Sequence, residues 1–152
     1  MESTIRRVIT GVDENGASRV ALDETLPREI ATRIAVTNIW SAGPSPVDNR
    51  LPLESGTRRF DPAQMADGGH GFMLIEFAPG FGRDDPGMHH TDTADQFFVV
   101  DGAIVLILDT EEVTLHRGDA GVLRGIRHGW RNETDNPALI VTTTLPALPL
   151  AG

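Results

Sequence analysis

Apolar and β-branched residues occur along this chain in short runs that are separated by turn-forming residues. Two of these runs, at 5–10 and 19–22, flank an Asn-Gly pair within 13–16, and this arrangement predicts an amino-terminal β-hairpin. The remaining runs are too short for buried helices and rich in branched side chains, so they predict strands. These runs are 34–40, 72–78, 103–108, 113–115 and 138–145. Residues 41–69 lack periodicity and contain four prolines, so they predict a long loop or arm.

The pattern as a whole favours an all-β protein with eight or more short strands, in a closed or double-sheet architecture. No stretch has a convincing amphipathic helix pattern. At 152 residues the chain is long enough for one domain with a real core. Within it we expect residues 1–70 to form the hairpin, a strand and the long arm, packed on a barrel of residues 71–146. Residues 147–152 are expected to form a frayed tail.

Composition excludes several classes of function. The net charge of −9 argues against binding of nucleic acid, whose phosphates demand a basic surface. All thirteen cationic residues are arginine, which excludes Schiff-base chemistry on a lysine. Cysteine is absent, so there is no disulfide, thiolate nucleophile or cysteine-bound metal. No signal peptide and no apolar run of membrane-spanning length is present, so a cytoplasmic location is expected, without a membrane partner.

Two histidine-bearing segments, 86–102 and 118–132, flank the predicted strand at 103–108. They resemble the two motifs of the cupin family, G-x5-H-x-H-x3–4-E-x6-G and G-x5-P-x-G-x2-H-x3-N. Asp95 stands in place of the glutamate, six residues before Gly102, and Gly125, His128 and Asn132 match the second motif, which lacks its proline here. The resemblance covers residues 72–145. It implies a double-stranded β-helix, or jelly-roll, barrel with the hairpin as an extension.

The first motif leaves two registers open. Successive side chains on a strand point to opposite faces, so only one of His89 and His90 can enter a regular barrel. If His89 points inward, Thr91 replaces the second histidine of the motif; if His90 does, Met88 replaces the first. The shorter, polar Thr91 is the more tolerable neighbour in a polar pocket, which favours His89. One metal-binding histidine of the usual set is missing in either register.

By the resemblance, the candidate metal ligands are His89, His90, Asp95 and His128. Two histidines and one carboxylate suit a divalent ion such as iron, manganese, zinc or nickel. Because aspartate is one methylene shorter than glutamate, Asp95 is alternatively a partner that orients a histidine. The sequence leaves open whether a metal is bound. It indicates no nucleotide cofactor.

The candidate catalytic residues are His128, His89 and Asp95. With a metal, the site would polarise a carbonyl, stabilise an enediolate or activate dioxygen. Without one, a histidine oriented by a carboxylate moves protons near pH 7, which suffices for isomerisation, dehydration or cyclisation. We therefore favour an enzyme, with metal-dependent chemistry as the first expectation, that acts on an oxygenated or aromatic small molecule as an isomerase, dehydratase, cyclase or dioxygenase. The alternative is a non-catalytic module that binds or senses a small ligand without metal.

The expected substrate pocket surrounds these groups. Trp130 shares a strand face with His128 and would line the pocket. The further pocket candidates are Gln96, Phe98, Glu76 and Arg124. The resemblance also implies a homodimer, in which the hairpin and the 41–69 arm would reach the partner. The sequence does not indicate which substrate is used.

Overall fold

The structure is a computed structural model that describes residues 4–61, 63 and 67–150. The chain divides into two compact units, residues 1–30 and residues 31–152. The predicted all-β class is confirmed, since ten strands and one short helix make up the regular structure of the described residues. None of the described helices has the length and apolarity needed to cross a membrane.

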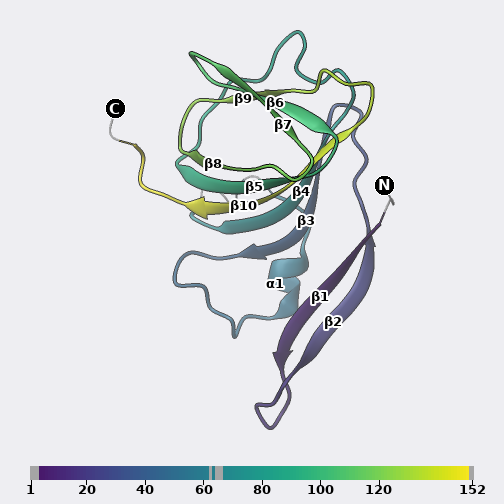
Figure 1. Cartoon of the computed structure of the whole chain (residues 1–152). Helices are drawn as coiled ribbons and strands as arrows, with labels where there is room; N and C mark the ends of the chain where they lie inside the picture. Colours follow the sequence, from purple (N-terminus) through teal and green to yellow (C-terminus); the bar gives the residue numbers. More distant parts are fainter. Residues whose placement is uncertain (1–3, 62, 64–66, 151–152) are drawn as a thin grey trace. The chain divides into compact units, whose positions relative to one another are not determined.

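The first unit is the predicted β-hairpin. Strands β1 (Thr4–Val12) and β2 (Ser18–Pro27) pair antiparallel (Figure 1). The Asp13 side chain closes the turn, because its Oδ1 accepts hydrogen bonds from the amides of Asn15 and Ala17 at 2.8 and 2.9 Å. Two arginine–carboxylate pairs, Arg6–Asp23 and Arg7–Glu24, join the strands.

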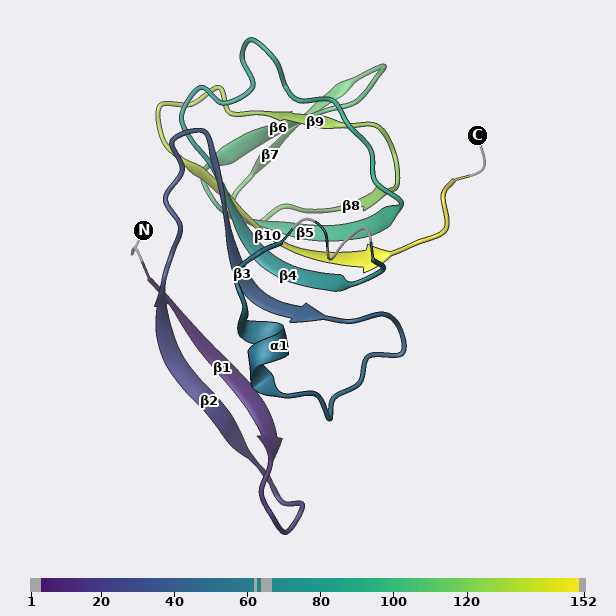
Figure 2. The same ribbon diagram turned by 180° about the vertical axis from the view of Figure 1, so that it is seen from behind.

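The second unit contains two antiparallel sheets, seen on opposite sides of the barrel in Figures 1 and 2. The larger sheet has the order β3-β4-β10-β5-β8 and the smaller β7-β6-β9. The strands are β3 (Ile34–Ala42), β4 (His70–Phe77), β5 (Thr93–Asp101), β6 (Ala103–Ile107), β7 (Glu112–His116), β8 (Ala120–Arg124), β9 (Gly129–Arg131) and β10 (Ala138–Pro146). A one-turn helix, α1 (Leu53–Thr57), lies within the segment expected to be a loop.

Alternate residues of the strands fill the barrel. On the central strands of the larger sheet, Phe97 lies opposite Thr142 and Val99 opposite Ile140, and all four point inward. Inward residues of both sheets then meet in one core, as in other double-sheet proteins. Its buried members are Phe77, Phe97, Val99, Ile104, Leu123, Trp130, Ala138 and Ile140.

A fully buried polar side chain ties three segments together at one end of the barrel. The Asn132 side-chain amide donates to the carbonyl oxygens of Phe77 and Ala78, each at 3.2 Å, and of Asn136 at 2.8 Å. Its Oδ1 accepts from the backbone amide and the hydroxyl of Thr134. Asn132 therefore has a structural role in this barrel, and the cost of burying its amide is offset by hydrogen bonds.

The loop after β4 passes so close to β9 that only glycine fits at one position. Gly82 has φ +76°, and a Cβ there would lie 2.1 Å from the carbonyl oxygen of Trp130. Gly118 has a similar positive φ, +97°, but a Cβ there would meet nothing within 4 Å. The two glycines therefore separate the cost of the backbone conformation from the cost of crowding.

We expect Gly118→Ala to lower the free energy of unfolding by about 1–2 kcal/mol, the cost of an L-residue at positive φ. Gly82→Ala should lose about 1–3 kcal/mol more, because the loop must move away from β9. Urea unfolding followed by circular dichroism measures both. Equal losses in the two variants would show that the close approach does not exist.

Candidate functional site

The two motif histidines lie opposite each other across a short antiparallel bridge. The His89 amide donates to the His128 carbonyl at 2.9 Å, and the His128 amide donates to the His89 carbonyl at 2.8 Å. Directly opposed residues project their side chains to the same face. The rings accordingly lie side by side, with centroids 4.6 Å apart at 52°.

His90 lies outside this pair. As the next residue along the chain it projects to the other face. Its ring is exposed, and Nε2 lies 3.9 Å from Oδ1 of Asp92, which is also exposed. The structure therefore brings His89, and not His90, to His128.

Backbone carbonyls fix the tautomer of both imidazoles. Nδ1 of His89 lies 2.7 Å from the Gly87 carbonyl, and Nδ1 of His128 lies 2.9 Å from the Ile126 carbonyl. A carbonyl only accepts, so each Nδ1 must carry the hydrogen, and Nε2 of each neutral ring keeps a free lone pair. Both rings thus offer Nε2 for a proton or a ligand.

The two histidines differ in burial. His89 is exposed, whereas His128 is only 4% exposed. Burial lowers the pKa of His128, and the nearby His89 lowers it further, against opposing contributions from the Ile126 carbonyl and Asp95. His128 is therefore neutral near pH 7, the form that acts as a base.

Asp95 brings a carboxylate close to the histidine pair. It lies on the inward face of β5, opposite Thr144 of β10. Burial raises the pKa of the Asp95 carboxyl, while hydrogen bonds from Thr93 and Thr144 and the charges of His128 and His89 lower it. Its Oδ1 is buried without a hydrogen-bond partner in the described part of the chain. An unpaired acceptor in such a place is costly to the fold and typical of a functional site.

Trp130 is the core residue that borders the site. It follows His128 by two residues, and the two rings meet edge to face with centroids 6.0 Å apart. On its other sides Trp130 packs against Phe77 at 5.8 Å and Phe97 at 5.3 Å. The indole is 8% exposed, so it is a rigid apolar wall beside His128.

Four residues expected in the pocket lie elsewhere. Gln96 and Phe98 are exposed on the face of β5 opposite to the one that carries Asp95. Glu76 is buried, but on the outward face of β4, because its neighbour Phe77 points into the core. Arg124 is exposed on β8. The structure does not bring these side chains to the histidine pair.

Sequence reasoning named Thr91 but missed two further threonines near the carboxylate, Thr93 and Thr144. Thr93 precedes Asp95 by two residues on the same face of β5, and Thr144 faces it from β10. Thr91 Oγ1 lies 2.6 Å from Thr93 Oγ1. The spacing of Thr93 and Asp95 was a usable signal for one of the two, but nothing in the local sequence points to Thr144.

The predicted metal ligands do not lie close enough together to form a complete metal site. Within the described ranges, no group of three His, Cys, Asp or Glu side chains is close enough to hold one ion. His89 and His128 can supply two imidazole ligands, but Thr91 takes the place of a further histidine, and its hydroxyl is bonded to Thr93. A catalytic ion in proteins commonly has three protein ligands, so two imidazoles hold it less firmly.

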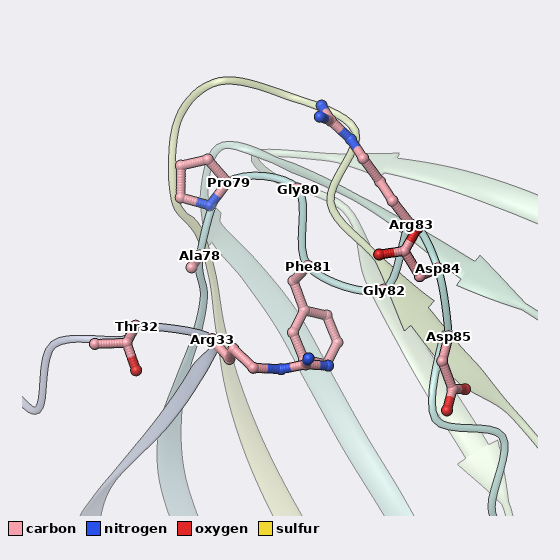
Figure 3. A pocket seen from close by; sticks show the side chains of 10 residues that line it. All are labelled: Thr32, Arg33, Ala78, Pro79, Gly80, Phe81, Gly82, Arg83, Asp84 and Asp85. Atoms are coloured by element: carbon pink, nitrogen blue, oxygen red, sulfur yellow. The ribbon is translucent and has the colours of Figure 1, made fainter.

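A separate cavity of about 140 Å³ has none of the predicted site residues in its lining (Figure 3). It is lined by Thr32, Arg33, Ala78, Pro79, Gly80, Phe81, Gly82, Arg83, Asp84 and Asp85. The Arg33 guanidinium lies over the Phe81 ring, 5.7 Å from its centroid. On β4 the cavity adjoins the Phe77 end, whereas Gly71, at the other end, is level with Thr144 and Asp95. Neither histidine lines this cavity.

Comparisons with known proteins agree on one family. The model described as "Cupin domain" matches residues 73–144. The Phomopsin biosynthesis cluster protein D of Diaporthe leptostromiformis is 31% identical over 156 residues, which cover 97% of this chain and 81% of that protein. The cupin-domain-containing oxidoreductase srdD of Neurospora crassa is 30% identical over 141 residues, covering 89% of this chain and 70% of that protein.

Two solved structures share the fold. TT1209 from Thermus thermophilus has a TM-score of 0.52 and 22% identity, covering 80% of this chain and 91% of that one. KdgF from Halomonas sp. has a TM-score of 0.50 and 18% identity, and the match covers 78% of this chain and 85% of that one.

The environment of Asp95 gives a prediction for stability. Because its folded-state pKa is raised, the folded protein holds this proton more tightly than the unfolded chain. Stability then falls as pH rises from the ordinary aspartate pKa through the raised one. In protein treated with chelator, Asp95→Asn should raise the free energy of unfolding by about 1 kcal/mol at pH 8, since it removes an unpaired buried charge. The difference should shrink towards pH 4.

Urea unfolding at both pH values measures this difference. Asp92→Asn, at an exposed carboxylate, is the matched control and should change little. A stability gap between Asp95→Asn and the original protein that does not depend on pH would contradict the assignment.

Proposed function

The chain belongs to the cupin family, and from that we propose that it is a small-molecule cupin enzyme that transfers protons with His89, His128 and Asp95. One observation carries the proposal: two imidazoles with free Nε2 atoms lie side by side, near a half-buried carboxylate whose Oδ1 has no partner among the described residues. Titratable groups in such surroundings are typical of catalytic sites.

Each residue has a distinct part in the proposed chemistry. His128, neutral and buried, takes a proton from the substrate at Nε2. The negative charge of Asp95 stabilises the imidazolium that forms. His89, exposed to solvent, takes up a proton from water at Nε2 and gives it to another atom of the substrate, while His128 later returns its own proton to water. Moving a proton from one atom to another in this way yields isomerisation, dehydration or cyclisation.

The proposed substrate is an oxygenated or aromatic small molecule. Trp130 offers an apolar wall on which a ring can pack. It lies next to His128, so a substrate packed on it would present its acidic hydrogen to the base.

A second candidate function is a metal-dependent oxidoreductase. It is favoured by the names of two relatives, both cupin-domain-containing oxidoreductases of Neurospora crassa, and cupins often bind a divalent metal. His89 and His128 would hold the ion, which would supply redox or Lewis-acid chemistry when bound. The missing third ligand places this candidate second.

Proton transfer is tested in D₂O with a panel of hydroxy-ketones and β-diketones, by following deuterium uptake at their acidic C–H groups with NMR. We expect exchange above the buffer rate for at least one compound. His128→Ala should lower that rate by about 10²–10⁴-fold, the usual contribution of a general base. His90→Ala, which removes the neighbouring histidine outside the pair, is the control and should keep the rate.

A His128→Ala variant that folds and exchanges as fast as the original protein would remove the proposed site. Reversible binding of a panel compound without any exchange would instead favour the non-catalytic module.

Metal content separates the two candidate enzymes. We expect the original protein and its His128→Ala and His90→Ala variants, purified without chelator, each to hold well below one equivalent of iron, manganese, zinc or nickel. Elemental analysis of the three proteins measures this. Near-stoichiometric metal that is lost only in His128→Ala would overturn the metal-free mechanism in favour of the oxidoreductase.

We further propose that the protein is a homodimer. The outward face of the larger sheet exposes Phe72, Phe98 and Val122 by 39%, 45% and 60%. They lie in two cross-strand rows without a charged residue: Phe72, Thr143, Gln96, Val122 and Leu74, Val141, Phe98, Ala120. In a chain with a net charge of −9, two copies can meet here without opposing like charges.

Light scattering at micromolar concentration should give twice the monomer mass for the original protein. Val122→Glu, which places a charge on this face, should lower the measured mass towards that of a monomer. A monomeric mass for the original protein would refute the dimer.

A further inference from the structure

The cavity beside the loop after β4 holds charged side chains that the proposed proton transfer does not use (Figure 3). Its walls are residues 32–33, which lead into β3, and residues 78–85, all within the second unit. Its volume of about 140 Å³ is below the roughly 300–1,000 Å³ of pockets for drug-sized ligands. A ligand of this cavity therefore has to be a small molecule.

Hydrogen bonds hold the walls of the cavity in place. The Ala78 amide donates to the Arg33 carbonyl at 2.9 Å, which joins the two segments of the lining. The Phe81 amide donates to the Ala78 carbonyl at 3.1 Å, and the Phe81 carbonyl accepts from the Asn132 amide at 2.8 Å. The cavity is therefore formed in advance, and a ligand loses little free energy in ordering it.

Arg33 supplies a cation whose position is held by an aromatic ring. Its Cζ lies 5.7 Å from the centroid of Phe81, within the range of cation–π attraction. The Phe81 ring in turn packs against Phe77, with centroids 5.3 Å apart. In the described part of the chain the Arg33 guanidinium has no carboxylate partner. Its planar fork of donors is therefore available to hold a ligand carboxylate by two parallel hydrogen bonds.

Asp84 supplies a carboxylate in the same lining. It is exposed, and it forms no ion pair or hydrogen bond with any residue that the structure describes. The other two charged side chains of the lining are engaged elsewhere. Nη2 of Arg83 donates to the Glu133 carbonyl at 2.9 Å. Oδ1 of Asp85 accepts from the Gly87 amide at 2.8 Å. Figure 3 shows the Arg83 and Asp85 side chains extending in opposite directions.

We propose that this cavity binds a small amino acid as its zwitterion, with the ligand carboxylate on Arg33, the ammonium on Asp84 and an apolar side chain against the Phe81 ring. Opposite charges in one small lining fit a ligand that carries both. A simple anion would face the charge of Asp84 without a partner for it, and a simple cation would likewise face Arg33. The site is separate from the histidine pair, so the inference does not depend on the proposed proton transfer.

The experiment uses the ¹⁵N-labelled full chain at neutral pH in 0.15 M salt, with amide signals followed by NMR. The probes are valine, isovalerate, which lacks the ammonium group of valine, and isobutylamine, which lacks its carboxylate. We expect valine to give saturable shifts at the amides of residues 78 and 80–85. Isovalerate and isobutylamine should each bind at least about tenfold more weakly, the factor that a lost hydrogen bond to a charged group commonly accounts for.

Two variants separate the two charged contacts. Arg33→Gln should weaken the binding of valine and isovalerate by about tenfold or more and leave that of isobutylamine unweakened. Asp84→Asn should weaken the binding of valine and isobutylamine to a similar extent and leave that of isovalerate unweakened. If Arg33→Gln fails to fold, Arg33→Lys, which keeps the charge and loses the planar fork, should still weaken valine.

The matched controls remove the same charges from the engaged side chains of the lining. Arg83→Gln and Asp85→Asn should keep the affinity for valine within about twofold, since salt screens charges that do not contact the ligand. Circular dichroism checks that each variant is folded.

Four results would each overturn the proposal. The first is valine that gives no saturable shift at the amides of the cavity. The second is isovalerate or isobutylamine that binds as tightly as valine, since the ligand would then need only one charge. The third is a loss in a control variant as large as in Arg33→Gln or Asp84→Asn. The fourth is valine shifts centred on His89 and His128, which would assign the ligand to the histidine pair.

Discussion

Asn132 is the constraint on which the barrel end and, through it, the site depend. Its side chain is fully buried and donates hydrogen bonds to carbonyls at the end of β4 and in the turn after β9. Its backbone amide donates to the carbonyl of Phe81. A buried amide of this kind strengthens the fold only while every partner stays in place. It therefore fixes β9, which carries Trp130, against β4 and the following loop. The crowding at Gly82 follows from the same arrangement, since the loop is drawn against the Trp130 carbonyl.

The part of the fold held by Asn132 supports a site whose residues lower the stability of the folded protein. Burial disfavours the charged forms of both His128 and Asp95, and Asp95 leaves an acceptor unpaired. Free energy lost in this way has to be offset elsewhere, and the core around Phe77, Phe97 and Trp130 together with the Asn132 network is the evident source. The bridge between His89 and His128 uses two backbone hydrogen bonds, and these hold the two histidines directly opposite each other.

Much of the fold could be predicted from the sequence, because short β-branched runs and turn residues are local signals. The hairpin at Asn15-Gly16 and the strands β3, β4, β6, β7 and β10 were found in this way, and motif spacing singled out Asp95 and His128. The sequence did not show which residues of β5 point inward, because Phe97 and Phe98 are adjacent aromatic residues and either could have pointed inward. Burial in the folded sheet decides between them, and it places Gln96 on the outside with Phe98. Thr144 could not be found at all, since only the register of β10 against β5 brings it to Asp95.

Thr91 is the position at which this chain departs from the first cupin motif, and the departure bears on the chemistry of the site. In the register that places His89 inward, the family motif expects a second histidine here, and its replacement by threonine removes a metal ligand. The structure shows where the smaller side chain lies instead: its Oγ1 is 2.6 Å from that of Thr93, which shares the inward face of β5 with Asp95. One substitution thus leaves two imidazoles where the register predicts three histidines. We take this as support for the proposed proton transfer over metal chemistry.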